Sequence, residues 1–258
     1  MDIRNRVVIV TGATGSIGRG VCLVLAARGM QVVVADLDQQ VCDRFADELV
    51  GRGYKAIAVA VDVTSRKATV KMAATVLEQL GAIDVLVNNA GIIGLAPLQE
   101  LEEAVWDRVI DVNLKGSFLC AQAVVTTMIE QKRGRIINVA SVAAARPAPF
   151  QSAYAATKSG VLGLTRVWCQ ELAAYDITVN TVCPGFVDSP MWSEHLGPAY
   201  AAVSGVESAA VLDALSRANI PLARPQQPKD LGEAVAYIAG ADNVTGHTLY
   251  VDGGFTQA

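Results

Sequence analysis

The chain has 258 residues, of which 52% are hydrophobic and 18% are charged, and its formal net charge is −4. This length and apolar content are sufficient to bury a large core, and we expect a single α/β domain over residues 1–258. The acidic balance leaves no basic stripe for nucleic acid or for an anionic membrane, so neither is expected as a partner.

The sequence predicts no metal site and no membrane segment. Five cysteines, at positions 22, 42, 120, 169 and 183, lack metal or redox spacing, and His195 and His247 do not complete a zinc set with them. Scattered thiols of this kind suit the reducing cytoplasm. No signal-peptide pattern is recognised, and no apolar stretch is judged long enough to span a bilayer. We therefore expect a cytoplasmic protein.

The first predicted element is a strand that leads into a glycine-rich turn. A β-branched run at 7–10 stops at Thr11-Gly12, and a helical pattern begins after Gly18. Such a turn lets the backbone approach a pyrophosphate, whose charge is met by free N–H groups and by the helix dipole. The turn residues that we expect to contact a dinucleotide are Gly12, Gly15, Ser16, Ile17 and Gly18.

A second buried run at 31–36 ends at Asp36, which lies 24 residues after Gly12. Dinucleotide-binding folds place a carboxylate near this position to accept hydrogen bonds from the adenosine ribose. A carboxylate repels the 2′-phosphate of NADP, and position 37 is Leu37 rather than arginine. Both features favour NAD as the cofactor. The alternative for Asp36 is a simple turn residue at the end of a strand.

Further strand-like runs alternate with helical stretches along the rest of the chain. This alternation predicts parallel pairing through right-handed crossovers, and hence a doubly wound, Rossmann-type sheet of seven strands with helices on both faces. Ligands in such sheets bind at the carboxyl ends of the strands. The additional runs lie at about 56–61, 84–87, 135–140, 177–182 and 248–251.

Tyr154 and Lys158 lie four residues apart on a predicted helix, which places an ammonium group beside a phenol. A neighbouring cation favours the phenolate, so the pair predicts a proton donor and acceptor closer to neutrality than a free tyrosine. Lowering the pKa from ~10 to ~7 requires about 4 kcal/mol, and one ammonium at 4 to 6 Å supplies about 2.8 to 4.2 kcal/mol. A second positive charge, such as a bound nicotinamide ring, is therefore expected. Taken alone, the pair fits an ordinary surface helix better.

Together, these motifs resemble the short-chain dehydrogenase/reductase family over about residues 5–254. The resemblance rests on the glycine turn, Asp36, Asn88-Asn89-Ala90-Gly91, Asn113, Ser141 and Tyr154-x-x-x-Lys158 in that order, with 13 residues from Ser141 to Tyr154. It implies a nicotinamide-binding domain with a catalytic group formed by Asn113, Ser141, Tyr154 and Lys158.

The resemblance also implies a role for each residue. Tyr154 would exchange the proton, Ser141 would bond the substrate oxygen, and Lys158 would anchor the nicotinamide ribose. Asn113 would kink its helix and hold a water that bridges to Lys158. The alternatives are a loop-capping Ser141 and an exposed Asn113, and for Asp62 a helix cap. The further cofactor contacts that it implies are Asp62, Val63, Asn89, Ala90, Gly91, Pro184, Gly185, Val187 and Ser189.

The glycine turn departs from the shorter branch of the family, because Ser16 stands where that branch has a glycine. Either the turn shifts to accommodate the Cβ atom of Ser16, or Gly15 adopts the unusual backbone angles that glycine allows. Ser189 likewise replaces the threonine of the family pattern, although it keeps the hydroxyl.

Residues 190–228 carry prolines and alanines without a clear strand, which predicts a mobile substrate lid. The run Ser-Pro-Met-Trp at 189–192 resembles bacterial NAD-dependent polyol and diol dehydrogenases. The sequence thus favours an NAD-dependent oxidoreductase that interconverts a small secondary alcohol and its ketone. A 3-oxoacyl thioester reductase and, in another class, an inactive NAD-bound sensor or scaffold stay open. The family resemblance implies a homotetramer, or a dimer, with the 252–254 turn near a neighbouring subunit.

Overall fold

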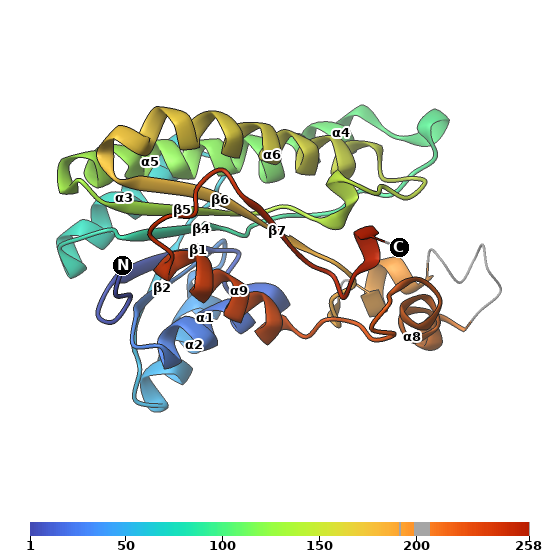
Figure 1. Cartoon of the computed structure of the whole chain (residues 1–258), viewed down its shortest axis with the longest axis horizontal. Coiled ribbons are helices and arrows are strands. Elements are labelled where there is room, and N and C mark those ends of the chain that lie inside the picture. Colours follow the sequence, from blue (N-terminus) through green and yellow to red (C-terminus); the bar gives the residue numbers. More distant parts are fainter. Residues whose placement is uncertain (191, 199–206, 258) are drawn as a thin grey trace.

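The computed structural model describes residues 1–190, 192–198 and 207–257. Its centre is a sheet of seven parallel strands in the order β3-β2-β1-β4-β5-β6-β7 (Figure 1). The strands are β1 Val7–Thr11, β2 Gln31–Asp36, β3 Lys55–Ala60, β4 Val85–Asn88, β5 Gly134–Val139, β6 Ile177–Pro184 and β7 Thr248–Val251. The predicted fold class and the predicted strands are confirmed.

Helices cover both faces of the sheet (Figure 1). One face carries α1 Ser16–Ala27, α2 Gln39–Gly51 and α9 Pro228–Gly240. The other carries α3 Arg66–Leu80, α5 Gly116–Gln131 and α6 Ser152–Leu172, with α4 Glu103–Ile110 against α6. Within the segment expected to be a lid, α8 Ser208–Asn219 lies away from the sheet.

The central strand β1 shows why the sequence forms this architecture. All five of its residues are buried, because helices cover it on both sides. Alternate side chains face opposite layers: Val8 and Val10 pack with α1 and α9, whereas Val7 and Ile9 pack with α3 and α5. A strand that is covered on both faces needs a continuous apolar run, and residues 7–10 provide it.

The strand order reverses between β1 and β4, which are neighbours in the sheet. The chain first proceeds outward from β1 through β2 to β3, and then crosses back to β4 on the other side of β1. The turn after β1 and the turn after β4 therefore border the same crevice at the carboxyl edge. In open α/β sheets this reversal is where ligands bind.

Gly12 carries the left-handed conformation in the turn after β1, with φ of +62°. A Cβ atom on Gly12 would lie 2.8 Å from the Ala90 Cα, so the two turns approach closely. Gly15 has ordinary extended angles, with φ of −71° and ψ of 166°, and a Cβ there would make only one contact, at 3.5 Å. The alternative in which Gly15 takes the unusual angles is therefore wrong, because Gly12 supplies the sharp turn.

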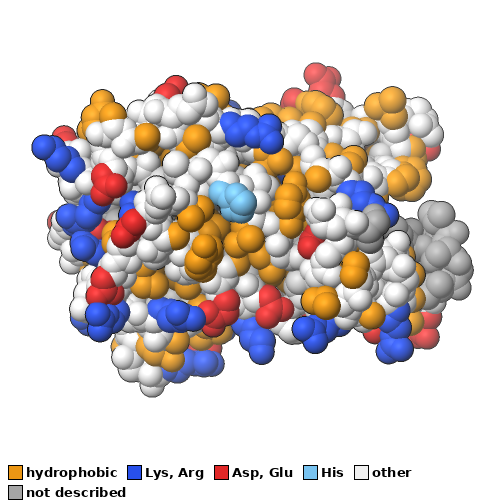
Figure 2. Space-filling model, in the orientation of Figure 1, with side chains coloured by type: hydrophobic (Ala, Val, Ile, Leu, Met, Phe, Trp, Pro, Cys, Tyr) orange, Lys and Arg blue, Asp and Glu red, His pale blue; other side chains and the backbone are white. Residues whose placement is uncertain are grey.

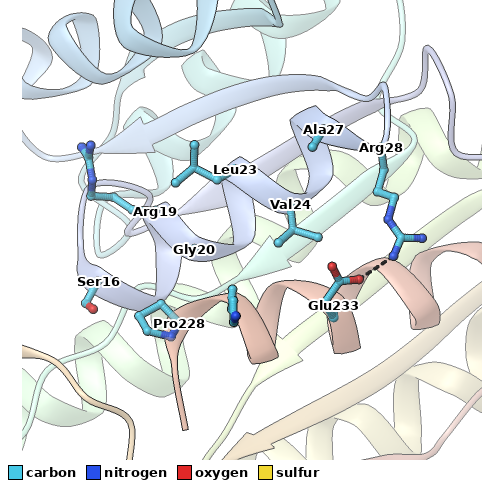
Figure 3. A pocket seen from close by; sticks show the side chains of 10 residues that line it. Ser16, Arg19, Gly20, Leu23, Val24, Ala27, Arg28, Pro228 and Glu233 are labelled. Carbon is cyan, nitrogen blue, oxygen red and sulfur yellow. Dashed lines mark hydrogen bonds and ion pairs between the residues drawn. The ribbon is translucent and has the colours of Figure 1, made fainter. Parts of the chain in front are cut away.

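Ser16 is the first residue of α1, and its side chain faces a groove between α1 and α9 (Figure 3). The groove has a volume of about 500 Å³. The two helices cross closely beside it, since a Cβ on Gly20 would lie 2.5 Å from the Pro228 carbonyl carbon. An ion pair between Arg28 and Glu233 lies at the rim. The serine is accommodated because its side chain projects into this groove.

The expectation that no apolar stretch reaches membrane-spanning length was wrong. Helix α4, the π turn η2 Asp111–Lys115 and α5 form one helical run, Glu103–Gln131, that is long and apolar enough by length and composition to cross a membrane. Within α5, Leu119, Val124 and Met128 are buried in the core between the sheet and α3. The apolar character of this run is that of a core helix.

Charges of both signs are mixed on the surface. On the face shown in Figure 2, basic and acidic side chains alternate without a basic stripe. Several charges form exposed ion pairs, such as Arg4 with Asp2 and Arg52 with Glu48. Exposed pairs of this kind contribute little to stability.

The glycine turn gives a first testable prediction. Gly18→Ala should lower the free energy of unfolding by about 2 kcal/mol or more, since the new Cβ would overlap the Gly12 carbonyl oxygen and lie 2.7 Å from the Ala13 Cα. Gly15→Ala, the matched control, should change it by less than about 1 kcal/mol. Urea unfolding without dinucleotide measures both. Equal losses in the two variants would contradict this account of the turn.

Candidate functional site

The four expected catalytic residues come from three elements that meet at the carboxyl edge of the sheet. Ser141 follows β5, Tyr154 and Lys158 lie on the first two turns of α6, and Asn113 lies in the π turn η2. The structure brings them together, because α6 contacts both η2 and the 3-10 turn that directly follows Ser141.

Lys158 is 4% exposed, and its Nζ donates a hydrogen bond of 2.9 Å to the Val139 carbonyl. The same nitrogen lies 5.5 Å from the centre of the Tyr154 ring, within the range of a cation–π contact. The predicted pairing of ammonium and phenol is therefore present. Burial lowers the pKa of Lys158 to about 8, because it disfavours the charged form.

Tyr154 is half-buried, and its pKa differs in direction from the expectation. Burial raises the pKa of Tyr154 above its ordinary value, and the hydrogen bond with Ser141 opposes that rise. The predicted lowering does not occur in the protein alone, because desolvation of the phenol outweighs the favourable contacts. The phenol thus needs a further positive charge before it ionises near neutrality.

Ser141 is buried, at 9% exposure, at the point where β5 ends. Its Oγ accepts a hydrogen bond of 3.1 Å from the Ala143 amide and begins the short 3-10 turn η3 Val142–Ala144. The loop-capping alternative is therefore present alongside the contact with Tyr154. One hydroxyl can serve both, because it accepts with one lone pair while its proton is free to rotate.

Asn113 is buried at 1% exposure, so the alternative of an exposed asparagine is wrong. Its Oδ1 accepts from the Ile92 amide at 2.8 Å, and its Nδ2 donates to the Ile92 carbonyl at 2.9 Å and to Thr157 Oγ1 at 3.2 Å. The π turn is a local irregularity of the kind that often accompanies functional sites. Asn113 thereby joins the segment after β4 to α6.

The N-terminus of α1 fits a pyrophosphate. The backbone N–H groups of Ser16, Ile17 and Gly18 make no hydrogen bond within the described residues, and no side chain caps the helix. Free N–H groups at a helix N-terminus attract phosphate oxygens. A dinucleotide is therefore compatible with the residues at this position.

Asp36 lies at the end of β2, where Thr14 holds it. Its Oδ2 accepts from the Thr14 amide at 3.0 Å and from the Thr14 hydroxyl at 2.6 Å, and its Oδ1 accepts from the Leu37 amide at 2.8 Å. Leu37 is 69% exposed beside it. Asp36 is thus both a strand-end residue and a carboxylate fixed at the crevice.

Thr11 was missed by the sequence reasoning, although it directly precedes Gly12. Its Oγ1 accepts from the amides of Asn89 and Ala90, each at 3.1 Å. The Asn89 side chain donates to the carbonyls of Thr11 and Gly12 at 2.9 and 3.0 Å. These bonds tie the turn after β1 to the turn after β4. In the sequence, only the position of Thr11 at the end of a strand could have indicated this role.

Gly91 is exposed next to two of the expected catalytic residues. A Cβ on Gly91 would lie 3.4 Å from both Asn113 Oδ1 and Lys158 Nζ. The backbone after β4 therefore passes directly over these groups.

Asp62 and Val63 lie after β3 and differ in environment. Asp62 is exposed, and its Oδ1 accepts from the amide and hydroxyl of Thr64. The helix-cap alternative for Asp62 is wrong, because Ser65 caps α3. Val63 is buried against Gly116 at the start of α5.

The segment after β6 holds the remaining expected contacts. The Gly185 amide donates to the Val251 carbonyl at 3.0 Å, and a Cβ there would lie 2.8 Å from the Asp252 Cα. Pro184 ends β6, Val187 is buried and pairs with Gln226, and the Ser189 carbonyl accepts from the Trp192 amide at 2.9 Å.

An apolar cluster lines the described part of the expected lid. Trp192, Leu196 and Val211 are buried together, and Phe186 packs against them with its ring 5.1 Å from that of Trp192. Phe186 also contacts the Phe255 ring at 4.9 Å. Sequence reasoning named Trp192 but missed Phe186. Met191 lies outside the described residues.

The 252–254 turn packs within its own chain. Asp252 is buried, and its carboxylate accepts from the amides of Gly254 and Thr256 at 2.9 Å. A Cβ on Gly253 would lie 2.6 Å from Ile220 Cγ2, just after α8. Its packing is therefore with the end of the lid segment. Within the ranges that the structure describes, no group of three His, Cys, Asp or Glu residues could hold a metal ion.

Comparisons with known proteins agree with this geometry. The family model for short chain dehydrogenases matches residues 6–197. The chain is 38% identical to the 3-oxoacyl-[acyl-carrier-protein] reductase FabG of Thermotoga maritima over 256 residues, which cover 98% of this chain and 99% of the relative.

Two solved structures share the whole fold. A variant of the actinorhodin polyketide ketoreductase with NADPH is 35% identical, with a TM-score of 0.94 and 98% of each chain covered. A xylitol dehydrogenase with NAD⁺ is 30% identical, with a TM-score of 0.92, 98% of this chain and 100% of that chain covered. The chain therefore belongs to the short-chain dehydrogenase family, and it is an oxidoreductase that acts on CH–OH groups with a nicotinamide dinucleotide.

Proposed function

We propose that this chain interconverts a 3-oxoacyl thioester and the corresponding 3-hydroxyacyl thioester, with NAD(H) as the cofactor. The observation that supports this chemistry is the meeting of three side chains at the carboxyl edge of the sheet: Ser141, Tyr154 and Lys158. The full-length similarity to a 3-oxoacyl-carrier-protein reductase supports the substrate class. This reverses the order of the two substrates favoured by the sequence alone.

The proposed chemistry assigns one task to each residue. The dinucleotide, when bound, supplies or accepts a hydride. In reduction, Tyr154 Oη gives its proton to the substrate oxygen as the carbonyl becomes an alcohol, and oxidation reverses this transfer. Ser141 donates to the same oxygen and stabilises its developing charge. Lys158 supports the phenolate and anchors the nicotinamide ribose, and Asn113 holds a water that bridges to Lys158.

The apolar cluster beside the site favours an acyl substrate over a polyol. Its partly buried members Phe186, Ile93 and Leu95 offer aromatic and aliphatic contacts, which suit an acyl chain and give a polyol few hydrogen bonds. The segment 190–228 would act as a lid over that chain. The polyol interpretation rested on four residues at 189–192, and the NAD⁺-bound xylitol dehydrogenase keeps it as the second candidate.

NAD(H) is proposed because Asp36 is fixed at the crevice by Thr14. Its carboxylate would bond the adenosine ribose and repel a 2′-phosphate, and exposed Leu37 provides no counter-charge. The preference for NAD(H) over NADP(H) needs a direct test, because the ketoreductase relative was solved with NADPH. The proposed dinucleotide contacts are the turn residues after β1, Asp36 and Leu37, Asp62 and Val63, Asn89 to Gly91, and the segment after β6.

A cytoplasmic homotetramer is proposed as the assembled form of the single domain. Exposed apolar side chains lie on α6 and on the helical run that contains Asn113: Trp106 on α4, Phe118 on α5 and Val167 on α6. Burying such side chains between copies of the chain would stabilise the association. The inactive sensor is set aside, since the whole catalytic group is present and assembled.

The cofactor proposal predicts a preference in kcat/KM for NADH over NADPH of at least about tenfold, equivalent to about 1.4 kcal/mol. The double variant Asp36→Ala/Leu37→Arg should narrow or invert this ratio, because it removes the repulsive carboxylate and adds a phosphate partner. Initial rates with acetoacetyl-CoA and each cofactor measure it. Equal use of both cofactors by the wild type would refute the assignment.

The same assay tests the substrate class. Wild-type protein should reduce acetoacetyl-CoA with NADH and should oxidise xylitol, vicinal diols and simple secondary alcohols with NAD much more slowly. Activity confined to the alcohols would make the polyol dehydrogenase the better candidate. Inactivity with every compound would restore the sensor hypothesis.

The acid–base role predicts that Tyr154→Phe lowers kcat by about 10²-fold to 10⁴-fold, because only the ionisable hydroxyl is lost. NADH binding, followed by fluorescence titration, should persist in this variant. Tyr175→Phe is the matched control, since Tyr175 is exposed in the 3-10 turn Ala173–Tyr175, which follows the far end of α6 from the site. Near-normal turnover by Tyr154→Phe would contradict the mechanism.

A further inference from the structure

Buried polar side chains form a connected set beneath the catalytic residues, within an otherwise apolar sheet. Asn138 on β5 and Thr181 on β6 have no exposed surface, and Thr165 on α6 is 1% exposed. Asn88 on β4 is 3% exposed and Ser117 on α5 is 7% exposed. Burial of polar groups is costly unless they are hydrogen-bonded, so their bonds indicate what the set does.

Asn138 lies at the centre of these bonds. Its Oδ1 accepts from Asn88 Nδ2 at 2.9 Å, and its Nδ2 donates to Thr165 Oγ1 at 2.9 Å. The Thr165 hydroxyl donates to the Val161 carbonyl at 3.0 Å and lies 2.7 Å from Thr181 Oγ1. Side chains of three adjacent strands are thus joined to the middle of α6.

The bonds continue from Asn88 back to the catalytic residues. Asn88 Nδ2 also donates to the Ser117 carbonyl at 3.2 Å, and Ser117 Oγ donates to the Asn113 carbonyl at 2.8 Å. Asn113 Nδ2 then reaches Thr157 Oγ1 on α6 at 3.2 Å. Since Thr157 and Thr165 lie on the same helix, the path closes. We call the set Asn88, Ser117, Asn113, Thr157, Thr165 and Asn138 the polar ring.

Two neighbouring residues of β5 hold two points of α6. Val139 accepts from Lys158 Nζ, and Asn138 donates to Thr165. Lys158 and Thr165 are about two helical turns apart on one face, so the two contacts together prevent the helix from sliding or rotating on the strand. Ser141 leaves the same strand just beyond them. The separation of Ser141 from Tyr154 therefore depends on this registration.

We infer that Asn138 and Thr165 are positioning residues that register α6 on β5, so that Ser141, Tyr154 and Lys158 meet. The inference rests on the proposed acid–base role of Tyr154. Neither residue touches the reacting groups, and each acts through the elements that carry them. A displacement of about 1 Å in such groups can reduce turnover by ~10²-fold, so small errors of registration are costly.

Thr165→Val tests the inference, because it keeps the shape of the side chain and removes only the hydroxyl. Thr165→Ser keeps the hydroxyl and should restore function. Thr178→Val is the matched control: Thr178 is a buried threonine on β6, at 6% exposure, whose Oγ1 has no hydrogen-bond partner within the described part of the chain. If Thr165→Val does not fold, the double variant Thr165→Val/Thr181→Val carries the same expectation, because it removes both members of the hydroxyl pair.

We expect Thr165→Val to lower kcat by about tenfold or more with a smaller change in KM, since geometry rather than substrate affinity is lost. In the oxidation of 3-hydroxybutyryl-CoA, the apparent pKa of the group that must be ionised should rise, because Lys158 no longer lies at its fixed distance from the phenol. Thr165→Ser and Thr178→Val should retain wild-type kcat and the wild-type pH profile. Amide hydrogen exchange without substrate should accelerate in α6 around Tyr154 in Thr165→Val only.

Wild-type kcat, pH profile and hydrogen exchange in Thr165→Val would overturn the inference, as would equal losses in Thr178→Val. Failure of the proposed function has a different signature, because the wild type itself would then be inactive with thioesters. The variants are in that case compared on the alcohol that the wild type oxidises. Should no substrate be found, unchanged hydrogen exchange in Thr165→Val still overturns the inference.

Discussion

The contact between the Lys158 ammonium and the Val139 carbonyl is the constraint on which the site depends. It fixes α6 on β5 at the point where the strand ends, and Tyr154 then lies one turn before it on the same helix face. Burial of a charged group is tolerated because the strand carbonyl compensates part of the lost hydration. The part of the lost hydration that is not compensated lowers the pKa of Lys158 to about 8. The position of the phenol and the electrostatics around it thus have one origin.

The same burial explains why the protein alone does not make an acidic tyrosine. Desolvation raises the pKa of Tyr154, and the Ser141 hydrogen bond only opposes that rise. Estimated from Coulomb's law, one ammonium at this range supplies at best about the 4 kcal/mol that is required, before desolvation is counted. Under the proposed function, binding of the oxidised dinucleotide and activation of the phenol are therefore coupled. The free N–H groups of α1 and the carboxylate of Asp36 would hold that dinucleotide in the crevice next to Gly91.

Local patterns predicted the elements well, because apolar periodicity and strand-end position are local properties. They located the seven strands, and the family resemblance built on them named Ser141 and the Tyr154–Lys158 pair that the structure brings together. They failed where the outcome depends on residues distant in the sequence. Thr11 bonds residues 78 and 79 positions away, and Asn138 bonds Thr165 across 27 positions. Gly12 rather than Gly15 makes the sharp turn, and it does so against Ala90, which is distant in the sequence. Under the proposed function the substrate class is revised, because similarity along the whole chain to a 3-oxoacyl-carrier-protein reductase carries more weight than four residues at 189–192.

Titration of the Tyr154 phenol in free and NAD⁺-bound protein tests the central claim most directly. Ultraviolet difference absorbance, corrected with the Tyr154→Phe variant, would follow its ionisation in both states. The account predicts a pKa above the ordinary value of about 10 in the free protein and a pKa lower by about two units or more with NAD⁺ bound. A phenol that already ionises near neutrality in the free protein, or one whose pKa does not change with NAD⁺, would contradict it.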